Sequence, residues 1–204
     1  MKTLVIDSAT EACSVALFDG DALIAGDCRV LGRGHAEQLV PMIQALPGKG
    51  RADRIAVALG PGSFTGVRVG LAAARALALA WQVDLVGYPT LALIAAMAAA
   101  EHPGKAVTVC TTGGHGEWFV QHFGPDGAAL APLASLAPEA AVAGAADLVA
   151  GSEAEALVAR RGSGTALPLW PDARAFALLD PALLGTDTAP LYGRAPDARL
   201  PGTA

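Results

Sequence analysis

The sequence predicts an α/β fold with two lobes, because short apolar runs typical of strands alternate with longer runs of helical periodicity. Three observations lead to this prediction. The turn Asp19-Gly20-Asp21 joins two strand-like runs, and the glycine-rich turn from Gly60 to Gly70 joins a third such run to an Ala-rich helix. The breaker triplet His102-Pro103-Gly104 then separates this region from a second one. We expect a mixed five-stranded sheet in the first lobe and a reduced second lobe.

The first lobe is expected to follow the order β-β-β-α-β-α-β-α. Asp19-Gly20-Asp21 is a strong hairpin signal. His35, Leu39 and Leu46 recur at helical spacing, and Pro47-Gly48 ends that helix. The predicted elements are strands at 3–7, 13–18 and 22–30, a helix from 35 to 46, a strand at 55–59, a helix from 64 to about 82, a strand at 84–88 and a helix at 89–100.

The second lobe gives weaker signals. Two strands are predicted at 106–111 and 117–123, around the turn Gly113-Gly114-His115-Gly116, and a short helix at 153–161. The stretch 128–184 is rich in Ala, Pro and Gly. We therefore divide the chain into a first lobe at 1–101 and a second lobe at 102–204, whose C-terminal tail is expected to pack back on the first lobe.

Composition excludes several classes of protein. A hydrophobic content of 53% with 16% charged residues is typical of a compact soluble chain. The net charge is −5 and Lys and Arg do not cluster, so tight binding of tRNA by this chain alone is not expected. Uninterrupted apolar runs are shorter than the ~20 residues that span a bilayer, and the first residues lack the apolar region of a signal peptide. We expect a cytoplasmic protein without a membrane segment.

The three cysteines are widely spaced and form no C-x-x-C pair, so neither a disulfide framework nor a zinc site is indicated. They are expected to act as small buried hydrophobes.

The turn from Gly60 to Gly70 does not match three glycine-containing motifs of similar appearance. A P-loop requires Lys and then Ser or Thr after its last glycine, but Val67-Arg68 follows Gly66. The dinucleotide fingerprint requires a sixth-position glycine where Thr65 stands, and a nucleophile elbow requires glycines two residues before and after Ser63. Ser63 is therefore expected to cap the following helix rather than act as a nucleophile.

Four segments together resemble the TsaB (YeaZ) family of tRNA threonylcarbamoyladenosine biosynthesis, which has the Gcp-like, actin-like (ASKHA, ribonuclease H-like) fold. They are Leu4–Leu17, Gly34–Pro41, Gly60–Leu77 and Pro190–Arg194. The resemblance implies a scaffold and dimerization subunit that is not catalytic alone. Its implied partners are a metal-dependent TsaD-type transferase and a TsaE-type ATPase, with a homodimer in their absence and only indirect contact with tRNA.

The two helices of the first lobe supply the predicted partner surface. Small residues such as Gly66, Gly70 and Ala74 recur at three- and four-residue spacing, and too much of the second helix is apolar for a freely solvated one. The alternative, that all these residues are intramolecular core, stays open. The residues predicted to bind the partner are His35, Leu39, Met42, Ile43, Val67, Val69, Gly70, Leu71, Ala74 and Arg75.

Catalytic residues and a metal site are not predicted. Metal-dependent relatives carry His-x-x-x-His on the helix after the strand that ends at Tyr88, whereas this chain has Pro89-Thr90-Leu91-Ala92-Leu93 there. The Asp-Ala-Arg that relatives often carry near Thr112 is also missing.

A nucleotide-phosphate loop at Asp7, Ser8 and Thr10 is the remaining candidate for chemistry. Ala9 stands where relatives have a hydroxyl, so Asp7 is expected to cap its own turn instead. No cofactor is assigned, and ATP or ADP at a subunit interface is left as an open alternative.

Two alternative functions are retained. One is an enzyme, either an actin-like small-molecule kinase or a peptidase. The other is a homodimeric regulator that uses the same helices.

Overall fold

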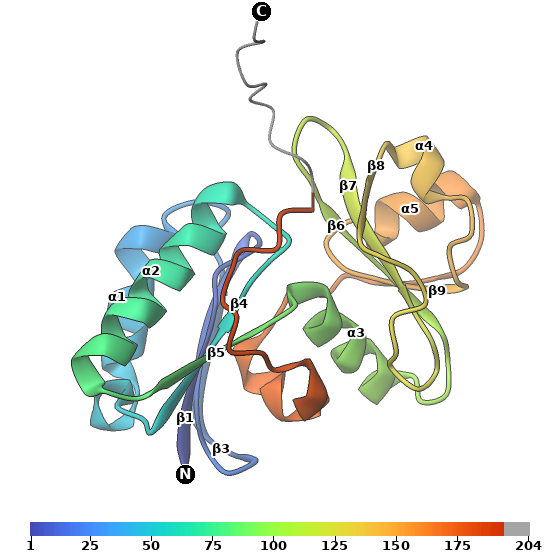
Figure 1. Cartoon of the computed structure of the whole chain (residues 1–204). Helices are drawn as coiled ribbons and strands as arrows, with labels where there is room; N and C mark the ends of the chain where they lie inside the picture. The colour runs from blue at the N-terminus through green and yellow to red at the C-terminus, as the bar shows by residue number, and fades with distance from the viewer. Residues whose placement is uncertain (194–204) are drawn as a thin grey trace, which may run out of the picture.

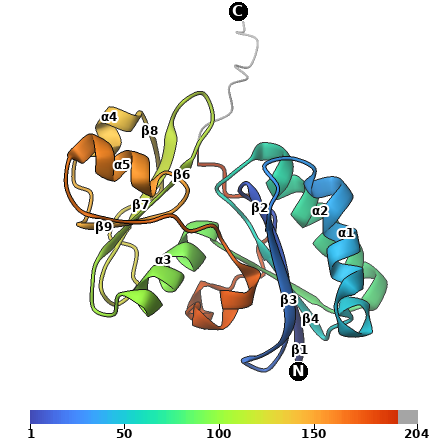
Figure 2. The ribbon, with the colours of Figure 1, turned by 180° about the vertical axis from the view of Figure 1, so that it is seen from behind.

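The computed structural model describes residues 1–193. It contains two lobes that lie side by side, each built on its own sheet, with helix α3 (Thr90–Glu101) between them (Figure 1). The view from behind shows the same division (Figure 2).

Two sets of elements build the lobes. The first lobe contains β1 (Lys2–Asp7), β2 (Ala12–Asp19), β3 (Ala22–Val30), α1 (His35–Ala45), η1 (Pro47–Gly50), β4 (Arg54–Ala58), α2 (Phe64–Trp81) and β5 (Asp84–Tyr88). After α3 come β6 (Val107–Thr112), β7 (Trp118–Phe123), β8 (Ala134–Leu136), α4 (Pro138–Ala141), β9 (Leu148–Ala150), α5 (Ala154–Arg161), β10 (Thr165–Leu167), η2 (Ala173–Leu178) and η3 (Pro181–Leu183).

The two sheets have the same topology. The first has the order β3-β2-β1-β4-β5, with β1 antiparallel to β2 and parallel to β4. The second has the order β10-β9-β6-β7-β8, with β6 antiparallel to β7 and parallel to β9. Read from the other end, the second order matches the first strand for strand, although β8, β9 and β10 have only three residues each. The second lobe is thus a shortened copy of the first.

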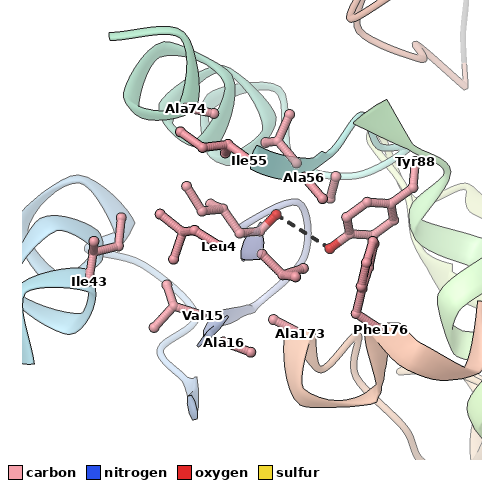
Figure 3. Close-up of a cluster of buried hydrophobic side chains, with 14 of the residues drawn as sticks. Leu4, Val15, Ala16, Ile43, Ile55, Ala56, Ala74, Tyr88, Ala173 and Phe176 are labelled. Atoms are coloured by element: carbon pink, nitrogen blue, oxygen red, sulfur yellow. Dashed lines mark hydrogen bonds between the residues drawn. The ribbon is translucent and has the colours of Figure 1, made fainter. Parts of the chain in front are cut away.

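The first core lies on both faces of its sheet. Helices α1 and α2 cover one face, because their apolar stripes point at β1, β2 and β4. Figure 3 shows Ile43 of α1 and Ala74 of α2 on one side of Leu4, with Tyr88 and Phe176 on the other side. Phe176 contacts the rings of both Phe18 and Tyr88 at centroid distances of 6.0 and 5.6 Å.

Helix α3 turns its apolar side chains toward the second lobe. Leu91 and Ile94 form one buried cluster with Val109, Phe119 and Leu148 of the second sheet. Because α3 has apolar residues around most of its circumference, it fits a position enclosed between two sheets.

The C-terminal part of the chain returns to the first lobe. The Ser14 hydroxyl donates to the Pro171 carbonyl and accepts from the Ala173 N–H, at 3.2 and 3.0 Å. Gly87 and Gly185 exchange a pair of backbone hydrogen bonds at the β5 edge. This segment, red in Figure 1, therefore adds to the first sheet and its core.

The predicted fold class is confirmed, and so are the elements of the first lobe. The strands at 22–30 and 84–88 have the predicted bounds, and α2 begins at the predicted residue. In the second lobe, β6, β7 and α5 were predicted, but the short strands β8, β9 and β10 were not. The division of the chain between residues 101 and 102 stays a prediction, and the second predicted lobe includes residues 194–204, which lie outside the described part.

Candidate interaction surface and interlobe pocket

Most of the residues predicted to bind a partner lie in the chain's own core. Of the ten, Val69 is half-buried and Arg75 is exposed. The other eight are buried: His35, Leu39, Met42, Ile43, Val67, Gly70, Leu71 and Ala74. The predicted residues thus lie mostly on the face of α1 and α2 that packs on the first sheet, and their role in partner binding stays a prediction.

The small residues at the start of α2 allow a close approach within the chain. A Cβ on Gly66 would overlap the Ser8 carbonyl oxygen, and one on Gly70 would lie 2.5 Å from the Ser8 hydroxyl. That hydroxyl donates to the Gly66 carbonyl at 2.9 Å. These glycines therefore seat the β1–β2 loop on α2 and are not evidence of a foreign backbone.

Helix α2 nevertheless exposes an unusual amount of apolar surface. Five of its 18 residues are buried, all on the side that faces the sheet. On the opposite side, Leu79 is 82% exposed. We define the outer α2 face as Val69, Ala72, Ala76, Leu79 and Ala80. These residues lie within a little more than a quarter of the helix circumference, and none of them carries a charge.

Other exposed residues lie on or beside α2. Val40 on α1 is 48% exposed, and α1 lies beside α2 on the same side of the sheet (Figure 2). At its other border, Arg75 donates to the Thr188 carbonyl at 2.8 Å and Arg68 donates to the Tyr192 hydroxyl at 3.0 Å. Both cations are thus turned toward the C-terminal segment, which leaves the outer α2 face without a charge of its own.

By length and composition, α2 is apolar enough to cross a membrane, which the count of uninterrupted apolar residues missed. Its buried residues, Leu71 and Ala74 among them, belong to the core on the first sheet. In this fold α2 is a covering helix of the first lobe.

The loop that follows β1 uses its polar groups internally. Asp7 is completely buried; its Oδ1 accepts from the Ala9 N–H at 3.0 Å and its Oδ2 lies 3.3 Å from the Tyr88 hydroxyl. Thr10 Oγ1 accepts from the Ala12 N–H at 3.3 Å. Burial raises the pKa of Asp7 to about 7 and also raises that of Tyr88. The predicted role of Asp7 as the cap of its own turn is confirmed.

Ser63 also takes its predicted role. Its hydroxyl accepts from the Gly66 N–H at 3.3 Å at the start of α2. The buried cysteines Cys13 and Cys110 are free thiols, and burial raises the pKa of each to about 12. Within residues 1–193, His, Cys, Asp and Glu side chains do not gather in a group of three that could hold a metal ion.

A cavity of about 630 Å³ lies between the two lobes. The first lobe lines it with the β1–β2 loop and the start of α2, the second lobe with the β6–β7 loop, and the C-terminal segment with its last described residues. The lining residues are Thr10, Glu11, Gly32, Gly62, Ser63, Phe64, Val67, Arg68, Thr112, Gly113, Gly114, Phe119, Leu191, Tyr192 and Gly193.

An aromatic and cationic cluster borders this interlobe pocket. The rings of Phe64 and Tyr192 stack at a centroid distance of 6.0 Å, and the Arg68 guanidinium carbon lies 3.3 Å from the centre of the Phe64 ring. None of Glu11, Phe64 and Arg68 was predicted as a site residue. For Arg68 alone a signal was available, because Arg68, Ala72, Arg75 and Leu79 recur along one side of α2, and the two arginines mark that side as solvent-facing.

Comparisons with known proteins show which proteins this chain resembles. The family model described as TsaD, tRNA N6-adenosine threonylcarbamoyltransferase, matches residues 29–190. The chain is 41% identical over 100 residues to the tRNA threonylcarbamoyladenosine biosynthesis protein TsaB of Escherichia coli (strain K12), a match that covers 47% of this chain and 43% of that protein. It spans less than half the length of the first curated relatives it matches.

Solved structures resemble the whole described fold. YeaZ from Pseudomonas aeruginosa superposes with a TM-score of 0.77 at 25% identity, covering 94% of this chain and 99% of that one. The ethanolamine utilization protein EutJ from Carboxydothermus hydrogenoformans superposes with a TM-score of 0.51 at 14% identity, covering 88% of this chain and 90% of that one. At that identity, the second likeness shows the fold alone.

Proposed function

Because this chain belongs to the TsaD/Gcp-like family, and within it to the TsaB (YeaZ) homologues of tRNA threonylcarbamoyladenosine biosynthesis, we propose that it is the non-catalytic scaffold subunit of the enzyme that makes this modified base. Its partner is a metal-bearing TsaD-type transferase, and a TsaE-type ATPase joins the complex. In their absence the chain forms a homodimer. The complex works in the cytoplasm and holds tRNA mainly through the other subunits.

The observation that supports this proposal is the outer α2 face. An uncharged apolar stripe along an 18-residue helix costs free energy when it faces water, and covering it with another apolar helix removes that cost. Charged residues are depleted at the centres of protein interfaces, and here the flanking Arg68 and Arg75 are held aside by Tyr192 and Thr188.

The choice of a related subunit as partner follows from shape. Ala72, Ala76 and Ala80 have small side chains at four-residue spacing, so a second helix can approach α2 closely. A transferase that shares the fold offers an equivalent helix, and so does a second copy of this chain. One face thus serves both the heterodimer and the homodimer, and the two exclude each other.

The assignment of catalysis to the partner is supported by the state of the β1–β2 loop. Asp7 has no exposed surface, and Ala9 and Tyr88 occupy its carboxylate oxygens. A Mg²⁺ ion carrying nucleotide phosphates needs a carboxylate that it can reach. We therefore assign no nucleotide hydrolysis to this chain alone.

The test is co-elution with the TsaD-type transferase of the same host on a sizing column at micromolar concentration. Leu79→Glu places a carboxylate in the centre of the outer α2 face, where a paired interface would have to bury it, so association is expected to weaken at least a hundredfold. The variant should remain folded, because the Leu79 side chain touches mainly solvent. Its circular dichroism spectrum checks this.

Leu130→Glu is the matched control, because Leu130 is 66% exposed in the second lobe, away from α2. The control should bind like the unaltered protein. Equal binding by both variants would contradict the proposed face. The assignment to tRNA modification is tested separately by depleting the protein in its host and measuring threonylcarbamoyladenosine in bulk tRNA by mass spectrometry, where an unchanged level would contradict it.

A further inference from the structure

The interlobe pocket contains a carboxylate oxygen without a hydrogen-bond donor. Glu11 lines the cavity, and its Oε2 is buried from solvent with no partner among the described residues. The backbone carbonyl of Glu11 accepts from the N–H groups of Leu31 and Gly32 at 2.9 and 3.0 Å, so the main chain that carries this side chain is fixed. A buried carboxylate oxygen without a donor is costly, and native proteins almost always supply one. Glu11 therefore indicates that a group with N–H donors binds here.

The same cavity is lined by a guanidinium group without an acidic partner. Arg68 donates to the uncharged Tyr192 hydroxyl at 3.0 Å, and its guanidinium carbon lies over the Phe64 ring. A guanidinium group has five N–H donors, and this hydrogen bond uses one of them. Within residues 1–193, neither Arg68 nor Glu11 takes part in an ion pair. Two opposite charges thus line one cavity without pairing to each other.

The rest of the lining suits an apolar group. Val67 and Phe119 are buried and line the cavity from the first and the second lobe. Phe64 and Tyr192 also line it and are 59% and 49% exposed, so the cavity opens to solvent beside these two rings. Its volume of about 630 Å³ is typical of sites for small organic molecules, which combine apolar walls with a few polar groups.

We propose that the interlobe pocket binds a small zwitterion with an apolar body, an amino acid or a dipeptide. Its ammonium group pairs with the carboxylate of Glu11, and its carboxylate pairs with the guanidinium of Arg68, whose N–H groups match both oxygens. The apolar body lies against Val67 and Phe119 and is removed from water there. A ligand with a single charge would leave one of the two protein charges unpaired, which is why a zwitterion fits better than a simple amine or acid.

This inference does not rest on the proposed scaffold function, because it uses the pocket residues and not the outer α2 face. A failure of the co-elution test leaves it untouched, and its own failure leaves the scaffold role untouched.

The first test is calorimetric titration of the unaltered full-length chain with L-phenylalanine and with L-leucyl-L-phenylalanine. Each compound is compared with its N-acetyl form, which lacks the ammonium group, and with its C-terminal amide, which lacks the carboxylate. At least one of the two zwitterions should bind, and each modification should weaken its binding at least tenfold. The two compounds distinguish an amino-acid site from a dipeptide site.

Two results of this titration would overturn the proposal. One is the absence of binding heat from both zwitterions up to about 10 mM. The other is an unchanged affinity after either modification, because recognition of both charges is what the pocket predicts.

The second test assigns each ligand charge to its residue. Glu11→Gln should weaken binding of the zwitterion at least tenfold but that of the acetylated form less than twofold, and Arg68→Gln should show the same pattern with the amide. Glu37→Gln and Lys105→Gln, at exposed positions, are the matched controls and should bind like the unaltered protein. Thermal melts check that each variant is folded, and the first test needs no variant. Unchanged affinity in folded Glu11→Gln or Arg68→Gln would overturn the assignment of the site.

Discussion

The hydroxyl group of Tyr88 lies 3.3 Å from the carboxylate of Asp7, and both side chains are completely buried. Burial raises the pKa of Asp7 from 3.8 to about 7, although the N–H of Ala9 and the Tyr88 hydroxyl both stabilise the ionised form. Desolvation therefore outweighs two hydrogen bonds at this position. The pair makes the stability of the first lobe depend on pH between about 4 and 7.

Asp7→Asn should remove a decrease in stability between pH 4 and pH 7. Because the pKa is higher in the folded state than in the unfolded state, folding takes up a proton in this range, and the free energy of unfolding falls by about 1.4 kcal/mol per pH unit. Above pH 7 the free energy of unfolding of the parent protein has completed this decrease, so the Asn variant should be more stable than the parent at pH 8. Urea unfolding at pH 5, 6, 7 and 8 measures both curves.

Asp84→Asn is the control for this prediction, since Asp84 is exposed at the start of β5. Parallel curves for the parent protein and Asp7→Asn over the whole range would show that Asp7 is ionised in the folded protein throughout.

Leu39→Asp and Val40→Asp should separate folding from binding on α1. Leu39 is 1% exposed in the first core, so a carboxylate there should cost more than about 3 kcal/mol and unfold much of the protein at 37 °C. Its neighbour Val40 is half-exposed, so that variant should stay folded while losing partner binding. Thermal melts followed by circular dichroism compare the two, and a stable Leu39→Asp would contradict the assignment of Leu39 to the core.

Gly66→Ala should destabilise the protein by about 2 kcal/mol or more, because the added methyl group would overlap the Ser8 carbonyl and push the β1–β2 loop off α2. Gly114→Ala should change stability by less than about 0.5 kcal/mol, since a Cβ there meets no atom within 4 Å. Urea midpoints measure the difference. Similar midpoints would mean that the loop does not depend on this contact.

Phe176→Ala should lower the free energy of unfolding by about 3–5 kcal/mol, because the ring packs against Phe18 and Tyr88 on the face of the first sheet opposite α1 and α2. Leu178→Ala, two residues later on the same turn, should cost little because Leu178 is exposed. Differential scanning calorimetry of the two variants gives the comparison. Equal melting temperatures would place Phe176 outside the core.

The first lobe could be predicted from the sequence because its signals are local. The turn Asp19-Gly20-Asp21 sets the β2–β3 hairpin, and the breaker Pro47-Gly48 follows α1. The second lobe lacked such signals, since β8, β9 and β10 have three residues each and alternation over three residues cannot be told from chance. Those strands form because β6, β7 and β9 offer them edges.

The apolar pattern of the sequence did not show which side of α2 packs on the sheet and which side is open, and the partner surface on α1 and α2 stays a prediction. When nearly the whole circumference of a helix is apolar, periodicity does not say which side faces the sheet. The buried side contains Gly70 and Leu71, and the open side contains Ala72 and Leu79, so apolar composition does not distinguish them. The signal that does is the pair Arg68 and Arg75 on the open side. The interlobe pocket was beyond prediction because Glu11, Phe64 and Tyr192 meet only through the tertiary fold.

The late return of the chain to the first lobe has a consequence for synthesis on the ribosome. Ala173 and Phe176 complete the core that residues near the N-terminus begin, and Gly185 covers the edge of β5. N-terminal domains usually fold while the rest of the chain is still being made. This one has to wait, because its core is complete only after residues 173–185 have left the exit tunnel. Until then, the apolar surface of the first core that Ala173 and Phe176 cover stays exposed on the nascent chain.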